Sequence, residues 1–180
     1  MSYQSIFDLL SDISNKTGIS FVLIGGFAVN YYKCARQTLD VDFLITEKDF
    51  EKILPCLESA GYKTDYRQDV FVRLIFRKDD LLMMDIDFMF VDESTLARIG
   101  QDASKTRIAG CELRVPSLEH LIALKLHAAR HNPKLRLSKD IPDIINLIRV
   151  NKIDVKTKKF KELCLKYGTE DIYNKILESI

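Results

Sequence analysis

The residues best suited to chemistry are a pair of aspartates, Asp40 and Asp42, in the apolar stretch LDVDF at residues 39–43. Side chains two positions apart in a strand point to the same face, so the two carboxylates lie side by side. Neighbouring carboxylates in an apolar strand repel each other and lose hydration. A divalent cation removes this conflict, and Mg²⁺ prefers hard oxygen ligands. The pair therefore predicts a metal site.

A second aspartate pair, Asp85 and Asp87, repeats the pattern in the stretch MDIDF at residues 84–88. If the two strands are neighbours, a third carboxylate joins the first pair, which suits a two-metal site for in-line phosphoryl displacement. The alternative is that one or both pairs lie at strand edges and face water. Either Asp85 or Asp87 can be the third carboxylate, because the strand register decides between them.

Gly25 and Gly26 lie between an apolar run, residues 21–24, and a segment that can form a helix. Glycines at such a turn let the backbone approach a phosphate, and the start of the helix offers free N–H groups. The alternative is a simple tight turn. Neither a P-loop nor a Rossmann fingerprint is present, since no GK[ST] follows and no G-x-G-x-x-G occurs.

The elements that position these residues follow from apolar periodicity and capping signals. Thr46 is a good N-cap for a helix over residues 47–60, which Pro55 bends and Gly61 ends. The other expected helices cover residues 3–14, 27–35, 117–129, 139–148 (capped by Ser138 or Asp140), 156–167 and 170–179. The expected strands cover residues 21–24, 41–45, 62–66, 70–76, 82–91 and 111–115, with a turn over residues 77–80.

The chain has 180 residues, 47% of them apolar, which suits one domain with a small appendage and excludes disordered and fibrous classes. Predicted strands dominate up to Pro116 and helices follow it. We expect an α+β protein. Residues 1–115 would form a mixed sheet with flanking helices, and residues 116–180 would form a helical subdomain.

The formal net charge of +1 excludes a wholly basic nucleic-acid coat protein, although residues 1–115 carry −4 and residues 116–180 carry +5. The four cysteines form no CxxC pair, so no zinc knuckle is expected. The opening residues lack the pattern of a signal peptide, and no apolar stretch approaches the roughly 20 residues that span a bilayer. These features predict a cytoplasmic protein without a membrane partner.

In combination, the glycine turn, the helix after it, the first aspartate pair and a later strand aspartate resemble the nucleotidyltransferase superfamily with the DNA polymerase beta-like fold. Residues 36–42 (RQTLDVD) are similar to the R-x-T-x-D-x-D form of its minimal and toxin-like members, including AbiEii-type toxins. Residues 115–125 (VPSLEHLIALK) and then 139–143 (KDIPD) are similar to the family's helical segment, P-S-x-E-x-L-I-x-x-K-L followed by K-D-x-x-D.

The resemblance implies roles for individual residues. Asp40 and Asp42 would bind Mg²⁺ or Mn²⁺, and Asp87 would be the third carboxylate, with Asp85 as its rival. The residues that would bind the NTP are Gly25, Gly26, Arg36, Thr38, Lys125 and Lys139. Gly26 stands where the family usually has Ser, which removes one hydroxyl from the phosphate grip. The three cations also have a simpler interpretation as solvated or snorkelling charges.

The implied activity is transfer of a nucleoside monophosphate from an NTP to an acceptor hydroxyl or phosphate, with release of pyrophosphate. The acceptor is open: a small molecule, a protein and tRNA all fit. One alternative is a toxin-like or accessory nucleotide-binding protein that acts through a protein partner, such as a cognate antitoxin-like protein, with weak or no turnover. Another is a nucleotide sensor. We interpret the histidine pair His127 and His131, four residues apart, as part of a solvated helix face.

Overall fold

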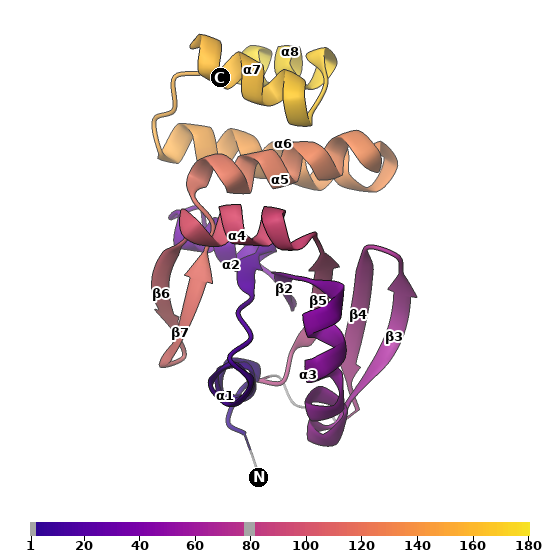
Figure 1. The fold of residues 1–180 in the computed structure, drawn as a ribbon. Helices are drawn as coiled ribbons and strands as arrows, with labels where there is room; N and C mark the ends of the chain where they lie inside the picture. Colours follow the sequence, from indigo (N-terminus) through magenta and orange to yellow (C-terminus); the bar gives the residue numbers. More distant parts are fainter. Residues whose placement is uncertain (1–2, 78–81) are drawn as a thin grey trace. The chain divides into compact units, whose positions relative to one another are not determined.

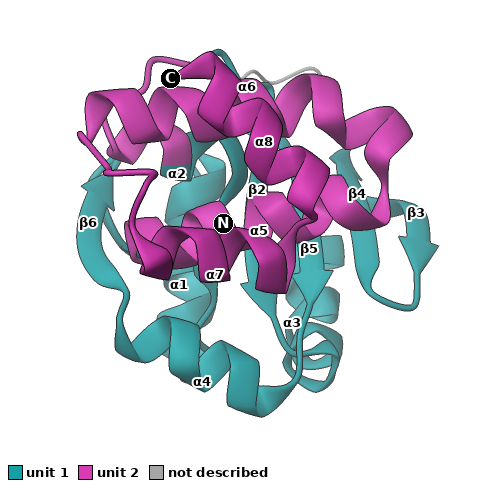
Figure 2. Cartoon of the chain, turned by 90° about the horizontal axis from the view of Figure 1, so that it is seen from above, with its two compact units in different colours: residues 1–28, 37–116 teal, residues 29–36, 117–180 magenta. Residues whose placement is uncertain are grey.

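The computed structural model describes residues 3–77 and 82–180. The chain divides into two compact units (Figure 2): unit 1 comprises residues 1–28 and 37–116, and unit 2 comprises residues 29–36 and 117–180. Beyond Arg77, the turn predicted over residues 77–80 lies outside the described residues. The predicted roles of residues 1–115 as a catalytic core and of 116–180 as a helical subdomain stay predictions.

Among the described residues, unit 1 is built on a seven-stranded mixed sheet in the order β3-β4-β5-β2-β1-β7-β6 (Figure 1). The strands are β1 (Val22–Ile24), β2 (Asp40–Ile45), β3 (Tyr62–Gln68), β4 (Phe71–Phe76), β5 (Asp85–Phe90), β6 (Ser104–Ile108) and β7 (Cys111–Val115). The β2–β5 and β1–β7 pairs are parallel, and the other neighbours are antiparallel. The predicted α+β class with a mixed sheet is confirmed, and β2 and β5 are neighbours.

The helices of unit 1 are α1 (Ile6–Thr17), α3 (Glu47–Ala60) and α4 (Glu93–Gln101), and α2 (Gly25–Tyr31) starts there and ends in unit 2. Phe50 of α3 packs on Phe88 of β5 with ring centroids 5.3 Å apart, and Phe88 stacks on Phe43 of β2 at 5.9 Å. Because side chains alternate along a strand, Asp40 and Asp42 lie on the sheet face opposite this aromatic core.

Helix α3 has the limits that its capping residues predict. The Thr46 hydroxyl accepts a hydrogen bond from the Asp49 amide at 3.1 Å, and Gly61 ends the helix with a φ of +111°. This backbone conformation is one that glycine adopts at little cost. The predicted helix over residues 47–60 is therefore confirmed at both ends, with Pro55 inside it.

Two elements of unit 1 were not predicted. Helix α4 follows an Asp92 cap, is nine residues long and buries one apolar side chain, that of Ile99, so it has few apolar residues from which a helical period can be read. Among the described strands, β6 lies at the edge of the sheet beside β7, and it carries the exposed Lys105 and Arg107. Edge strands tolerate such charges, and the charges hide the strand pattern.

Unit 2 consists of the end of α2 and the helices α5 (Leu118–His131), α6 (Pro133–Val150), α7 (Lys158–Tyr167) and α8 (Glu170–Ser179). The prediction that a helix starts near residue 139 is wrong, because α6 starts at Pro133, a favoured first helical position, and continues through Pro142. Ser138 and Asp140 therefore lie inside the helix and do not cap it. Across residues 3–77 and 82–180, no helix combines the length and apolar character that crossing a membrane requires.

Candidate active site

The four aspartates of the two predicted pairs lie on one face of the unit 1 sheet. In the parallel β2–β5 register, Asp40 is opposite Asp85 and Asp42 is opposite Asp87. Asp87 is 9% exposed, whereas the other three are half-buried. The pairs therefore lie on two interior strands of the sheet and away from its edges, so that one carboxylate neighbours another both along and across the strands.

The glycine turn contacts this face directly. Gly25 has a φ of +63°, and a Cβ atom built on it would lie 1.8 Å from Asp42 Oδ2. A Cβ on Gly26 would lie 2.6 Å from Thr38 Oγ1. Both glycines are thus required by the close approach of the backbone to two predicted site residues, and a simple tight turn does not need these contacts.

We expect Gly25→Ala to destabilise the chain by more than the cost of a positive φ alone, which is about 1 kcal/mol. The added methyl group would have to displace the Asp42 carboxylate. Urea unfolding measures the free energy of unfolding of each variant. Gly18→Ala is the matched control, because Gly18 has a φ of +70° and would place its Cβ in open space. Equal destabilisation of both variants would contradict the close approach.

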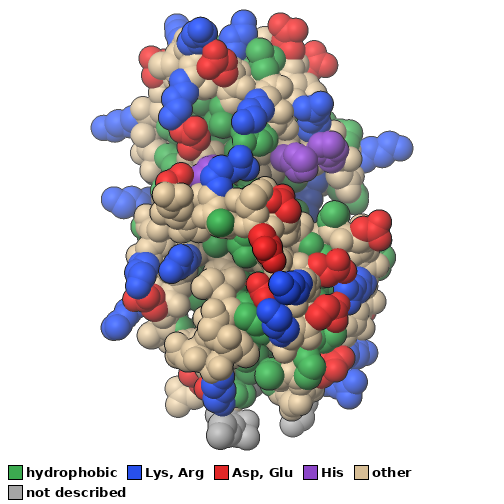
Figure 3. All heavy atoms as spheres, viewed as in Figure 1, with side chains coloured by type: hydrophobic (Ala, Val, Ile, Leu, Met, Phe, Trp, Pro, Cys, Tyr) green, Lys and Arg blue, Asp and Glu red, His purple; other side chains and the backbone are tan. Residues whose placement is uncertain are grey.

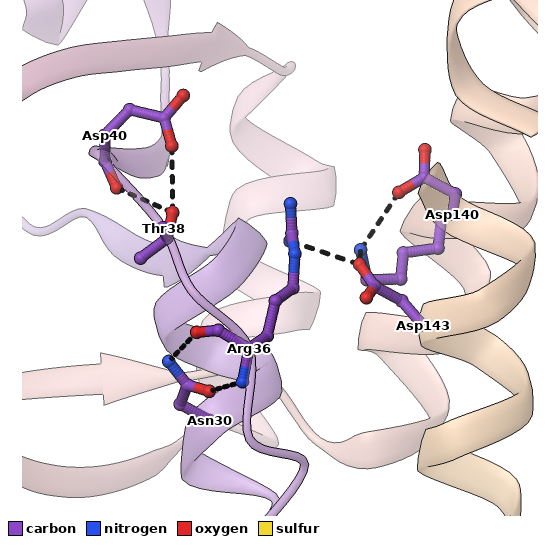
Figure 4. A network of polar contacts seen from close by, with 7 residues as sticks. Asn30, Arg36, Thr38, Asp40, Asp140 and Asp143 are labelled. Atoms are coloured by element: carbon purple, nitrogen blue, oxygen red, sulfur yellow. Dashed lines mark hydrogen bonds and ion pairs between the residues drawn. The ribbon is translucent and has the colours of Figure 1, made fainter. Parts of the chain in front are cut away.

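Thr38 orients the first aspartate. Its hydroxyl donates to Asp40 Oδ1 at 2.9 Å and lies 3.2 Å from the Asp40 carbonyl oxygen (Figure 4). A hydroxyl that donates to a carboxylate fixes its rotamer and leaves lone pairs on the carboxylate oxygens for another ligand. Thr38 thus positions Asp40.

The sequence analysis missed Arg73, which lies beside the second aspartate pair. In the β4–β5 pairing, Arg73 is opposite Asp87. Its Nη2 lies 3.4 Å from Asp85 Oδ2, and its Nε lies 3.8 Å from Asp87 Oδ1. Burial by itself lowers the pKa of the Arg73 guanidinium, but Asp87 and Asp85 outweigh burial and the net pKa is raised. The register of β4 against β5 would have revealed Arg73, but the sequence does not specify that register.

In unit 2, Lys125 belongs to a buried network of charges. Its Nζ contacts Asp140 Oδ1 at 3.0 Å and Asp143 Oδ2 at 2.7 Å, and Arg36 Nη1 lies 3.1 Å from the same Asp143 oxygen. Lys125 is 6% exposed and Asp140 is 2% exposed, so this lysine does not snorkel to water. Lys139, also on α6, is exposed.

Asn30 fixes the segment that carries Arg36. Its Nδ2 donates to the Arg36 carbonyl at 2.9 Å, and the Arg36 amide donates to Asn30 Oδ1 at 2.7 Å (Figure 4). Figure 4 also shows the Arg36 side chain pointing to Asp143. Arg36 and Lys125 thus share one carboxylate, and their binding to a nucleotide stays a prediction.

The aspartate face has the donor chemistry of a Mg²⁺ or Mn²⁺ site, because carboxylate oxygens are the ligands that these ions prefer. Asp42 also lies where only glycine leaves it room. Within residues 3–77 and 82–180, however, no three acidic, histidine or cysteine side chains converge as a complete set of metal ligands. The donor chemistry fits a divalent cation, but the described side chains do not form a complete ligand set as they lie, and the contacts of Arg73 with Asp85 and Asp87 compete with a cation.

The histidine pair belongs to unit 2, and the ring contact found for each histidine is with the other. The ring centroids of His127 and His131 are 4.2 Å apart, and both residues are exposed. Figure 3 shows histidine side chains at the surface. The expected solvated helix face is confirmed.

Comparisons with known proteins agree on the class of fold. A family model described as nucleotidyl transferase AbiEii toxin, type IV TA system, matches residues 8–179. The solution structure of the antibiotic-resistance factor ANT(2'')-Ia is 14% identical, covers 96% of this chain and 95% of its own, and has a TM-score of 0.64. A crystal structure of ANT(2'')-Ia with adenylyl-2''-tobramycin is 15% identical over 88% of this chain and 92% of its own, with a TM-score of 0.62.

A third similar structure is the lincosamide antibiotic adenylyltransferase LnuA with bound lincomycin. It is 16% identical, covers 78% of this chain and 93% of its own, and has a TM-score of 0.54. No curated protein sequence matches the chain. At these identities the solved structures support the fold alone, and the evolutionary relationship is supported by the family match over residues 8–179.

Proposed function

Because this chain belongs to the nucleotidyl transferase AbiEii toxin family, we propose that it transfers a nucleoside monophosphate from an NTP to an acceptor hydroxyl or phosphate and releases pyrophosphate. The observation that supports this reaction most strongly is the aspartate face itself. Asp42 and Asp87 lie opposite each other on parallel strands, and the Gly25 turn approaches Asp42 closely.

Asp40, Asp42 and Asp87 would hold Mg²⁺ or Mn²⁺, which when bound neutralises negative charge on the α-phosphate and on the leaving pyrophosphate. The backbone of Gly25 and Gly26 would bind phosphate oxygens through its N–H groups. An Asp87 oxygen would take the proton of an acceptor hydroxyl. The hydroxyl oxygen would then bond to the α-phosphorus as the bond between the α-phosphorus and pyrophosphate breaks. Thr38 would hold the Asp40 carboxylate in place through its 2.9 Å hydrogen bond.

We assign Arg36, Lys125 and Lys139 to the triphosphate. Arg36 and Lys125 are already paired with Asp143, so a phosphate that binds either cation must compete with that carboxylate. Lys139 is exposed and carries the same charge. The burial of Lys125 favours a role in holding the network together.

The acceptor that the charges favour is a small molecule or a protein. Basic residues of α7 and the segment before it are the strongest candidates for a polyanion site, but two of them have local partners: Lys158 lies 3.6 Å from Glu162, and Lys159 lies 2.5 Å from Glu119. On the face in Figure 3, basic and acidic side chains are mixed. Lysines that pair with neighbouring carboxylates offer less net positive charge to the phosphates of a tRNA.

We therefore expect the KM for the acceptor to change little with salt, and the triple change of Lys156, Lys158 and Lys159 to Gln to leave it unchanged. If the acceptor is tRNA, the logarithm of affinity falls with the logarithm of salt concentration with a slope of about −0.7 per phosphate contacted on a single strand. Measuring KM at two salt concentrations, with and without the triple change, distinguishes the cases. A steep slope that the triple change flattens would establish a polyanionic acceptor such as tRNA.

The experiment that tests the activity uses the purified chain with each labelled NTP, Mg²⁺ or Mn²⁺ and a cell extract. Transfer of label to a metabolite or macromolecule, with pyrophosphate release, supports the proposal. Tight NTP binding without label transfer or pyrophosphate would instead support the nucleotide sensor. Label transfer that appears or disappears only with a second protein would support action through a partner, for which the family's type IV toxin–antitoxin description suggests an antitoxin.

A further inference from the structure

Arg73 supplies a positive charge within the face that is expected to bind a divalent cation. Its guanidinium spans the second aspartate pair, with contacts of 3.4 Å to Asp85 and 3.8 Å to Asp87. Asp87 is also the partner of Asp42 in the β2–β5 register. One carboxylate is thus shared by the two functions of holding an arginine and completing a metal site.

The two partners of Arg73 differ in exposure and distance. The Asp85 side chain is 37% exposed and forms the shorter contact, whereas the Asp87 side chain is 12% exposed and forms the longer one. A divalent cation and a guanidinium repel each other, and they cannot use the same carboxylate oxygen at full strength. The geometry favours an arrangement in which Asp85 stays paired with Arg73 and Asp87 binds the cation.

We propose that Arg73 is a positioning residue that lowers the affinity of the aspartate face for its divalent cation, and that Asp85 acts by anchoring Arg73 and is not itself a metal ligand. This inference rests on the proposed function, since it takes Asp40, Asp42 and Asp87 as the metal ligands. Without a cation, the guanidinium offsets part of the repulsion among the four carboxylates. A cation that binds must displace Arg73 from Asp87.

Direct Mn²⁺ binding, followed by the electron paramagnetic resonance signal of free Mn²⁺, tests this inference without any turnover. We expect Arg73→Met to bind Mn²⁺ about tenfold more tightly than the unchanged chain. Even at the dielectric constant of water, repulsion between a guanidinium and a divalent ion about 6 Å apart raises the Kd of the ion about tenfold. Arg73→Lys keeps the charge and should stay within about threefold of the unchanged chain.

Arg67→Met is the matched control. Arg67 lies on the neighbouring strand β3, its side chain is 37% exposed against 36% for Arg73, and it also pairs with two carboxylates, those of Glu47 and Glu51. It contacts neither aspartate pair in those interactions. Its Mn²⁺ affinity should equal that of the unchanged chain. An equal gain in Arg67→Met and Arg73→Met would overturn the specific role of Arg73.

Asp85→Asn separates an anchor from a ligand. In the unchanged chain it should weaken Mn²⁺ binding, because Arg73 then pairs with Asp87 alone. In the Arg73→Met background the weakening should be smaller, since that chain loses only the Asp85 charge and has no arginine to anchor. Equal weakening in both backgrounds would show that Asp85 does not act through Arg73 and would overturn the proposal.

The outcomes also separate this inference from the proposed function. If the unchanged chain binds Mn²⁺ and Asp42→Asn does not, the aspartate face is the metal site. Under that result, an Arg73→Met affinity that is unchanged or weaker overturns only the role of Arg73. If no variant binds Mn²⁺, both proposals are overturned. If Arg73→Met fails to fold by circular dichroism, Arg73→Gln removes the same charge and decides the question in the same assay.

Discussion

Asp42→Asn is expected to reduce nucleotide transfer by about 10³-fold or more while the chain stays folded. The substitution keeps the shape of the side chain, so the contact with the Gly25 turn is preserved. It removes one negative charge from the point where Asp42 and Asp87 are opposite each other. Loss of a metal ligand costs several kcal/mol of transition-state stabilisation, which corresponds to this change in rate. Label transfer from NTP measures it.

Stability in the absence of metal should be close to that of the unchanged chain or slightly higher, because one source of repulsion among four carboxylates is removed. Asp65→Asn is the control, since Asp65 is an exposed aspartate on the edge strand β3 of the same sheet. It should retain full activity. Full activity in Asp42→Asn would end the metal-site interpretation, and an unfolded Asp42→Asn chain would show that Asp42 has a structural role.

The parts of the fold that could be predicted have local signals. The ends of α3 follow from the Thr46 hydroxyl and from the positive φ at Gly61, both of which act within one turn of the helix. The strand β7 is found over the predicted residues because its buried and exposed residues alternate. In the site, the spacing of Asp40 and Asp42 was sufficient to place them on one face.

The parts that could not be predicted depend on partners distant in the sequence. Asp140 looked like a helix cap because Pro142, two residues later, suits the first turn of a helix, but Asp140 lies inside α6 and pairs with Lys125 from α5. Tertiary contacts of this kind override local signals. Arg73 is a further example, since its contact with Asp87 depends on the register of β4 against β5, which no pattern within either strand specifies.

The register of β2 against β5 gives the two candidates for the third carboxylate different neighbours. Asp87 is opposite Asp42 and is 9% exposed, and Asp85 is opposite Asp40 and accepts a hydrogen bond from Arg73 at 3.4 Å. Asp87 is buried beside Asp42, the residue that the Gly25 turn approaches, so it is better placed to hold a cation away from water. A half-exposed carboxylate that is already bound to an arginine is better placed to anchor it.

Asp87→Ala should therefore lower turnover by about 10³-fold, and Asp85→Ala by less than about tenfold. The two variants also differ in their response to metal. If Asp85 acts through Arg73, its loss weakens cation binding, and raising the Mn²⁺ concentration should restore most of the Asp85→Ala activity. Asp87→Ala lacks a ligand and the acceptor of the hydroxyl proton, so excess Mn²⁺ should not restore it.

Turnover measured over a range of Mn²⁺ concentrations gives both comparisons in one experiment. The reverse ranking, with Asp85→Ala the more damaged and Asp87→Ala rescued by Mn²⁺, would move the third carboxylate by two residues along β5. Because Asp85 and Asp87 share a sheet face, the rest of the fold would accommodate either assignment. The decision therefore rests on which carboxylate Arg73 holds when the cation is bound, and the metal dependence of the two variants measures that directly.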